Sequence, residues 1–99
     1  MYVVIWEFLA KTGLEAEFER AYGPEGVWVS LFRTDEGYLG TELLHSLDGI
    51  YLTVDRWSSR EAYENFKDRN RSEYDAIDRR CAHLTERERE LGTFFRVER

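Results

Sequence analysis

The chain has 99 residues, of which 42% are hydrophobic and 34% charged, so length and composition predict one small globular domain over residues 1–99. Fourteen Lys and Arg stand against twenty Asp and Glu, a formal net charge of -6. No stretch gathers enough basic residues to follow a phosphate backbone, which argues against nucleic-acid binding. The longest apolar run is far shorter than the roughly 20 residues that cross a bilayer, and no signal-like segment opens the chain, so we expect no membrane partner and a cytoplasmic location.

The cysteine, histidine and aromatic residues restrict the kinds of functional site that the chain can contain. A lone cysteine, Cys81, excludes an internal disulfide and a thiolate cluster, which fits a reducing compartment. His45 and His83 lie at no spacing typical of metal ligands, so no metal site and no cofactor are expected. Six Tyr, six Phe and three Trp supply more ring surface than a small core needs, and this excess predicts an aromatic-lined pocket or a large interface.

The first third of the chain predicts a strand and two helices. Residues Tyr2–Ala10 are almost wholly apolar, which is typical of a central strand buried on both faces. Thr12 and Glu15 match a capping box, and a helix with apolar residues every fourth position runs from there to Gly23. Residues 28–32 have apolar side chains at helical spacing and favour a second, short helix.

A hairpin is the strongest local signal. Tyr38–Leu47 and Ile50–Trp57 flank Asp48 and Gly49, a pair typical of a two-residue type I′ turn. Pairing Leu47 with Ile50 then fixes every other partner in the hairpin.

That register has two consequences for candidate site residues. Asp55 falls opposite Glu42, and like charges in a cross-strand pair cost stability unless a proton or a cation relieves them, which would raise the pKa of one carboxyl. Alternatively, the register slips, or Arg56, Arg96 and water solvate the pair. Trp57 falls opposite Gly40, where the missing side chain leaves room for an indole. Trp57 therefore either shields the glycine or faces a substrate, and Tyr63 either packs half-buried or directs its phenol into a gap between helix and sheet.

The remainder of the chain predicts a long helix and a final strand. Ser58 and Glu61 match a second capping box, and the helix is interrupted near Asn70. Thr85 and Glu88 repeat the capping pattern for one more helical turn, which ends at Leu91 and Gly92 and leaves residues 93–98 as the last strand.

The predicted element order is βαββαβ. Right-handed crossovers place both helical segments on one face of a four-stranded antiparallel sheet, which is the ferredoxin-like α+β arrangement. The opposite face carries apolar residues and has no cover, so we expect it to pack on a second copy and form a homodimer.

Three stretches resemble the antibiotic biosynthesis monooxygenase family of dimeric α+β barrels: Val27-Trp28-x-x-Leu31-Phe32, Leu39-Gly40-Thr41-Glu42-Leu43-Leu44 and Tyr51-Leu52-Thr53-x-Asp55-Arg56-Trp57-x-Ser59-x-x-Ala62-Tyr63-x-x-Phe66. Some members of that family are cofactor-independent monooxygenases that oxidise polycyclic phenols to quinones at a site of the form Asn-x-x-x-Trp-x-x-x-x-x-Tyr. Trp57 and Tyr63 match this pattern, and Thr53 stands in place of the amide. The resemblance implies Trp57, Tyr63 and Thr53 as catalytic residues.

The predicted function is then a cofactorless oxygenase acting on an aromatic phenol or hydroquinone between sheet and helices. Its predicted substrate-binding residues are Trp28, Phe32, Tyr51, Asp55 and Phe66. Tyr63 and Trp57 would donate hydrogen bonds to substrate oxygens, and the proton acceptor is water, the substrate or a carboxylate such as Asp55.

The sequence leaves three alternative functions open. A dimeric module that binds an aromatic or quinone ligand without turnover has the same composition, and so does a structural dimer whose aromatic residues form only core. The superfamily also includes haem-degrading enzymes, which use an Asn on the first strand and a His on the second helix. This chain has Glu7 and Phe66 in those regions, which argues against haem.

Overall fold

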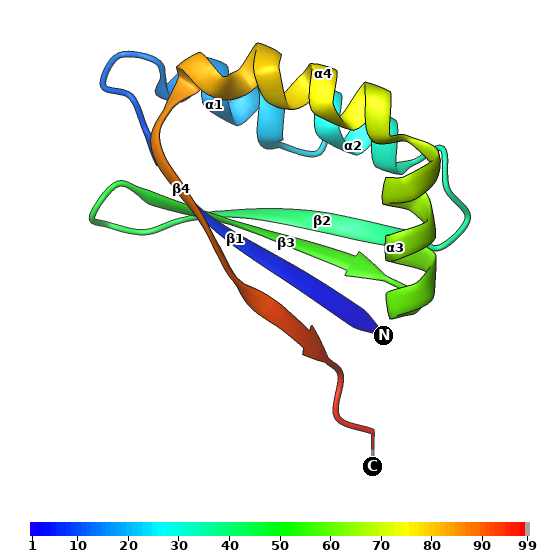
Figure 1. Ribbon diagram of the computed structural model, residues 1–99. Coiled ribbons are helices and arrows are strands. Elements are labelled where there is room, and N and C mark those ends of the chain that lie inside the picture. Colours follow the sequence, from blue (N-terminus) through cyan, green and yellow to red (C-terminus); the bar gives the residue numbers. More distant parts are fainter. Residues whose placement is uncertain (99) are drawn as a thin grey trace.

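Four strands form one antiparallel sheet in the computed structural model, which describes residues 1–98. The strands, in spatial order, are β2 (Tyr38–His45), β3 (Ile50–Trp57), β1 (Tyr2–Ala10) and β4 (Thr85–Phe95). The helices α1 (Glu15–Tyr22), α2 (Val27–Phe32), α3 (Arg60–Arg69) and α4 (Arg71–Cys81), with the 3-10 turn η1 (Ala82–Leu84), all lie on one side of the sheet (Figure 1). This arrangement confirms the predicted ferredoxin-like α+β fold.

The core lies between the sheet and this helical layer. β1 is central, as its two apolar faces predict, because it pairs with β3 on one side and β4 on the other. Val4 and Phe8 of β1 point into the core, where they are at most 5% exposed. Phe18 and Phe66, from α1 and α3, are fully buried against the same core. Within residues 1–98 no helix has both the length and the hydropathy to span a bilayer.

The hairpin forms where predicted, but its register differs by one residue. The Ser46 N–H donates to the Ile50 carbonyl at 2.8 Å, so the loop has three residues, and Gly49 closes it with φ +83°. A type I turn followed by a left-handed glycine is a common three-residue hairpin loop. The predicted pairing of Leu47 with Ile50 is therefore wrong, and β2 ends at His45.

The shifted register exchanges the two faces of β2. Thr41 pairs with Asp55, and Glu42 pairs with Val54, so the predicted opposition of Asp55 and Glu42 is wrong. Glu42 instead forms an ion pair with Arg56 at 2.6 Å. Because side chains alternate along a strand, a shift of one residue turns Thr41 toward the helices and Glu42 away from them.

β4 replaces a predicted helical turn. Residues 87–90, which were expected to be helical, pair with β1 over Trp6–Leu9, and Arg89 forms an ion pair with Glu7 at 3.3 Å. Helix propensity and a capping pattern favoured the helix, whereas the free edge of β1 offers backbone hydrogen bonds along the whole segment. Charged side chains on both faces are typical of an edge strand that avoids further pairing.

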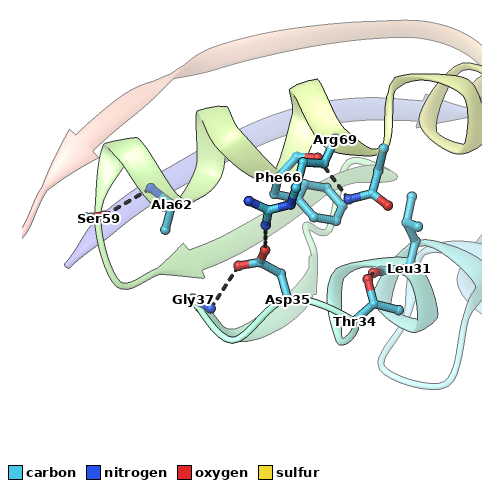
Figure 2. Close-up of polar contacts among 9 residues, drawn as sticks. Leu31, Thr34, Asp35, Gly37, Ser59, Ala62, Phe66 and Arg69 are labelled. Carbon is cyan, nitrogen blue, oxygen red and sulfur yellow. Dashed lines mark hydrogen bonds and ion pairs between the residues drawn. The ribbon is translucent and has the colours of Figure 1, made fainter.

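The helix starts also differ from the predicted capping boxes. α1 follows Leu14 without a side-chain cap, and the Glu15 carboxylate accepts from the Gly13 N–H at 2.8 Å, so Thr12 is not the cap. The cap of α3 is Ser59 rather than Ser58, because the Ser59 Oγ accepts from the Ala62 N–H at 3.0 Å (Figure 2).

Polar contacts connect the C-terminal end of α3 to the turn before β2. The predicted interruption at Asn70 is confirmed, and the Asn70 Nδ2 donates to the Phe66 carbonyl at 2.9 Å. The Asp35 carboxylate accepts from the Gly37 N–H at 2.8 Å and also pairs with Arg69 (Figure 2). α3 and the start of β2 are thereby held together beside the core.

Candidate functional site

A cavity opens between the sheet and helices α1, α2 and α4. Its lining is mostly aromatic, with a few polar side chains, and comprises Trp6, Phe8, Tyr22, Trp28, Val29, Phe32, Thr41, Thr53, Asp55, Tyr74, Asp78 and Glu88. The centre of a water molecule can occupy about 60 Å³ of it, and the total space between the lining atoms, part of it open to solvent, is about 490 Å³. Apolar walls with a few converging polar groups are typical of a small-molecule site.

Asp55 is the buried acid of this cavity. It lies on β3 and is 8% exposed, and no ion pair within residues 1–98 includes it. Burial raises the pKa of Asp55 to about 6, although a hydrogen bond from Thr41 acts in the opposite direction. The sequence offered a raised pKa only as one consequence of repulsion by Glu42, whereas in the structure desolvation is its cause.

Two hydroxyl groups follow Asp55 in a hydrogen-bonded row. The Thr41 Oγ1 donates to the Asp55 Oδ1 at 2.7 Å, and the Tyr38 Oη donates to the Thr41 Oγ1 at 2.6 Å. Tyr38 is half-buried, and burial raises the pKa of its phenol. The row therefore consists of one carboxyl group and two hydroxyl groups that are protonated at neutral pH.

Four of the predicted site residues line the cavity. Thr53 and Asp55 come from β3, and Trp28 and Phe32 come from α2. Trp28 is 7% exposed, and its Nε1 is buried without a hydrogen-bond partner within residues 1–98. A buried donor of this kind costs free energy until it meets an acceptor.

Two further predicted binding residues lie outside the lining. Tyr51 is 1% exposed, its hydroxyl donates to Glu19, and burial together with Glu19 raises its pKa to about 12. Phe66 packs edge-on against Phe32, with 5.6 Å between ring centroids. Both residues support the cavity from the surrounding core.

Trp57 is enclosed by aromatic rings beside the cavity. It is fully buried, its ring centroid lies 5.6 Å from that of Phe32 and 5.4 Å from that of Tyr38, and its Nε1 also lacks a partner. Trp57 pairs with Tyr38, while Gly40 pairs with Arg56, so the predicted contact between Trp57 and Gly40 is wrong.

Tyr63 lies next to Trp57 on α3, with 5.4 Å between ring centroids. Burial, followed by nearby Tyr74 and acidic groups, raises the pKa of Tyr63 well above its usual range. Its phenol therefore stays protonated at neutral pH. The Lys67 ammonium lies 5.5 Å from the Tyr63 ring centroid and 4.9 Å from that of Tyr74, which joins the cavity lining to this cluster.

Several lining residues were not identified from the sequence. The sequence did not predict Thr41 as a lining residue, because the assumed register turned its side chain toward the opposite face. Tyr74 and Asp78 lie one turn apart on α4, and their spacing was a signal that they share a face. Glu88 was assigned to a helical turn. Within residues 1–98 no group of three or more His, Cys, Asp and Glu is arranged to hold a metal ion.

Comparisons with known proteins agree with this fold. The family model described as antibiotic biosynthesis monooxygenase matches residues 1–77. No curated protein matches the chain. Among solved structures, Rv0793 from Mycobacterium tuberculosis has 16% identity and a TM-score of 0.75, with 99% of this chain and 96% of that one covered. SnoaB from Streptomyces nogalater, a cofactor-independent oxygenase, has 14% identity and a TM-score of 0.70, with 99% and 94% covered. PA3566 from Pseudomonas aeruginosa has 17% identity and a TM-score of 0.70, with 98% and 94% covered. At these identities the solved structures establish a shared fold.

Proposed function

This chain belongs to the antibiotic biosynthesis monooxygenase family, and we propose that it is a cofactor-independent monooxygenase that oxidises an aromatic phenol or hydroquinone. The observation that carries this proposal is the buried Asp55 carboxyl on an aromatic-lined cavity. The rings bind and orient a planar substrate, and the carboxyl supplies a base. The relationship to SnoaB in fold supports the reaction class.

Asp55 starts the reaction by removing the proton of a substrate hydroxyl. A pKa of about 6 keeps the group ionised at neutral pH and close to the value at which a general base is most effective. The substrate anion then transfers one electron to O2, and the resulting radical and superoxide combine to form a C–O bond. The peroxide anion formed in this way takes back the proton held by Asp55 and becomes a hydroperoxide. Loss of water from the hydroperoxide leaves a carbonyl group, so one oxygen atom enters the product and the other enters water.

The predicted catalytic residues have distinct positions relative to this base. Thr53 lines the cavity and can donate to a substrate oxygen in place of the family's amide. Trp57 packs against Phe32 of the cavity wall and Tyr63 packs against Trp57, both outside the lining, and we propose that their donors serve a substrate oxygen at that end of the cavity. The Trp57 N–H has no partner within residues 1–98, and the Tyr63 phenol stays protonated at neutral pH; both support this role.

Oxygen uptake by metal-stripped protein, with a panel of anthrones and hydroquinones, tests the proposal. Asp55→Asn removes the base and should lower turnover by about a hundredfold or more. The exposed Asp48 in the hairpin loop provides a matched control, because Asp48→Asn should retain wild-type turnover. Tyr63→Phe and Trp57→Phe should also lower turnover. Quenching of tryptophan fluorescence by the same compounds, without uptake above the spontaneous rate, would instead establish a non-catalytic binding module.

We also propose a homodimer that forms through the face of the sheet opposite the helices. Phe94 and Leu44 are 48% and 45% exposed, and Phe94 borders an open groove together with Val3 and Ile5 of β1. Apolar patches of this kind on a soluble protein are typical of protein interfaces. Sedimentation at micromolar concentration should give twice the chain mass of 11.8 kDa, whereas a monomer would contradict this assembly.

A further inference from the structure

We propose that the cavity selects a positively charged aromatic substrate, a phenol or hydroquinone that carries a protonated amine, and that Asp78 and Glu88 bind this amine at the mouth of the cavity. The inference rests on the proposed function for the phenol end of the substrate, and it adds the charge of the other end. It assigns a role to two residues outside the family pattern of Thr53, Trp57 and Tyr63.

The cavity lining carries charges of one sign only. Three of its side chains are acidic, those of Asp55, Asp78 and Glu88, and none belongs to Lys, Arg or His. No ion pair within residues 1–98 includes any of the three. The Lys67 ammonium lies outside the lining, 4.9 Å from the Tyr74 ring centroid. An anionic substrate would therefore be repelled by the lining, and a cationic one would be attracted.

The three carboxyl groups lie at different depths. Asp78 of α4 and Glu88 of β4 are exposed although they line the cavity, so they border its opening and define the mouth. Asp55 is 8% exposed and lies further inside. Its Oδ1 accepts from Thr41, and its other carboxylate oxygen accepts no hydrogen bond within residues 1–98. One substrate can therefore present a hydroxyl group to Asp55 and an amine to the mouth.

The carboxyl groups act on one another and on a shared ring. Burial and then the charge of Asp78 raise the pKa of Glu88, as expected of like charges with no cation between them. Burial, followed by Asp78, Asp55 and Glu88, raises the pKa of Tyr74 to about 12. All three charges therefore act at one ring of the lining. An ammonium group bound there would relieve a repulsion that a neutral substrate leaves in place.

The rings beside the mouth suit an organic ammonium group. Tyr74 packs edge-on against Trp28 with 4.9 Å between ring centroids, and the Trp28 ring lies 6.1 Å from that of Tyr22. All three residues line the cavity. The faces of Trp and Tyr rings attract ammonium groups, whereas hard metal ions are held by several oxygen ligands. Acids among aromatic faces therefore indicate an amine as the cation.

Isothermal titration calorimetry of the full chain without O2 measures this charge preference, because binding is then separated from turnover. The probes are three hydroquinones of similar size with an aminoethyl, a hydroxyethyl or a carboxymethyl side chain. At neutral pH they are cationic, neutral and anionic. We expect the aminoethyl probe to bind at least about tenfold more tightly than the hydroxyethyl probe, and the carboxymethyl probe to bind most weakly.

A double variant, Asp78→Asn with Glu88→Gln, removes both charges of the mouth and keeps the size of the side chains. It should bring the Kd of the aminoethyl probe to within about threefold of the Kd of the hydroxyethyl probe. The Kd of the hydroxyethyl probe should stay within about threefold of wild type, which shows that the cavity is intact. The matched control, Glu73→Gln with Asp75→Asn, removes two charges from exposed positions of α4 outside the lining and should keep the preference of wild type.

The outcomes separate the charged mouth from the oxygenase. Equal Kd values for the cationic and neutral probes in wild type would overturn the inference, and oxygen uptake with the neutral probe would leave the oxygenase standing. A preference that survives in the mouth variant, or that the control loses equally, would reflect the net negative charge of the chain and would also overturn it. A preference that only the mouth variant loses would support the inference, and the absence of uptake with every compound would then overturn the oxygenase alone.

Discussion

The buried Asp55 carboxyl predicts an unusual dependence of stability on pH. Its pKa is about 6 in the folded chain against 3.8 for an ordinary aspartate, so between these values the folded state holds a proton that the unfolded state has lost. Stability therefore falls as pH rises through this window, opposite in sign to an aspartate in an ion pair. At about 1.36 kcal/mol per pKa unit, ionisation of Asp55 costs about 3 kcal/mol of the free energy of unfolding above pH 6.

Asp55→Asn isolates this contribution because it removes the titration and keeps an oxygen that accepts from Thr41. The free energy of unfolding of this variant minus that of wild type should increase by about 2 kcal/mol between pH 4.5 and pH 7.5, the share of the total that falls in this interval. Urea unfolding followed by tryptophan fluorescence measures it, at one protein concentration because dimerisation would shift the midpoint. Asp48→Asn supplies the baseline for other carboxyl groups.

A difference that stays constant within about 0.5 kcal/mol over this range would refute the reasoning. Asp55 would then titrate at an ordinary pKa, which means that water reaches it freely and that burial does not tune it as a base.

Single substitutions at Thr41, Ser59 and Phe94 test three further features of the structure. Thr41→Val should raise the pKa of Asp55 above about 6, because the lost hydrogen bond stabilises the carboxylate. A carboxyl-carbon NMR titration measures this pKa. An unchanged value would contradict the hydrogen bond between Thr41 and Asp55. Ser59→Ala should lower the free energy of unfolding, measured in urea, by about 1 kcal/mol, whereas Ser58→Ala should have little effect. Equal losses for the two variants would show that Ser59 is not the cap of α3. Phe94→Glu should convert a homodimer to monomer in sedimentation, and a dimer that survives would exclude this face as its interface.

The hairpin shows how far local sequence patterns determine the site. Asp48 and Gly49 located the turn correctly, and the alternation of β3 placed Tyr51, Thr53, Asp55 and Trp57 together on one face, where the structure has them buried. The choice between a two-residue and a three-residue loop decided the partners of that face. Both loops contain a glycine with positive φ, so the local residues did not distinguish them. The core resolved the ambiguity, because Leu43 of β2 packs half-buried against it while Leu44 is exposed.

β4 shows a second limit of the same kind. Residues 86–90 alternate acidic and basic side chains, Thr85 and Glu88 form a capping pattern, and the segment has no apolar face, so every local criterion favours a helix. What makes them a strand is the unpaired edge of β1, about eighty residues earlier in the chain. Backbone pairing over such a separation leaves no periodic signal when neither face of the strand packs in the core. Glu88 consequently joined the cavity lining without any sequence pattern that pointed to it.

Asp55 itself gives the strongest argument that the cavity has a chemical role. A domain of this size has a total free energy of unfolding of about 5–15 kcal/mol. A buried charge that costs about 3 kcal/mol at neutral pH is therefore a large fraction of that stability. The fold does not require that charge, because an amide at the same position would accept the hydrogen bond from Thr41. Asp55 forms no ion pair within residues 1–98 that would offset the cost. Buried ionisable groups of this kind concentrate at functional sites, so chemistry in the cavity accounts for a charge that the fold itself does not need.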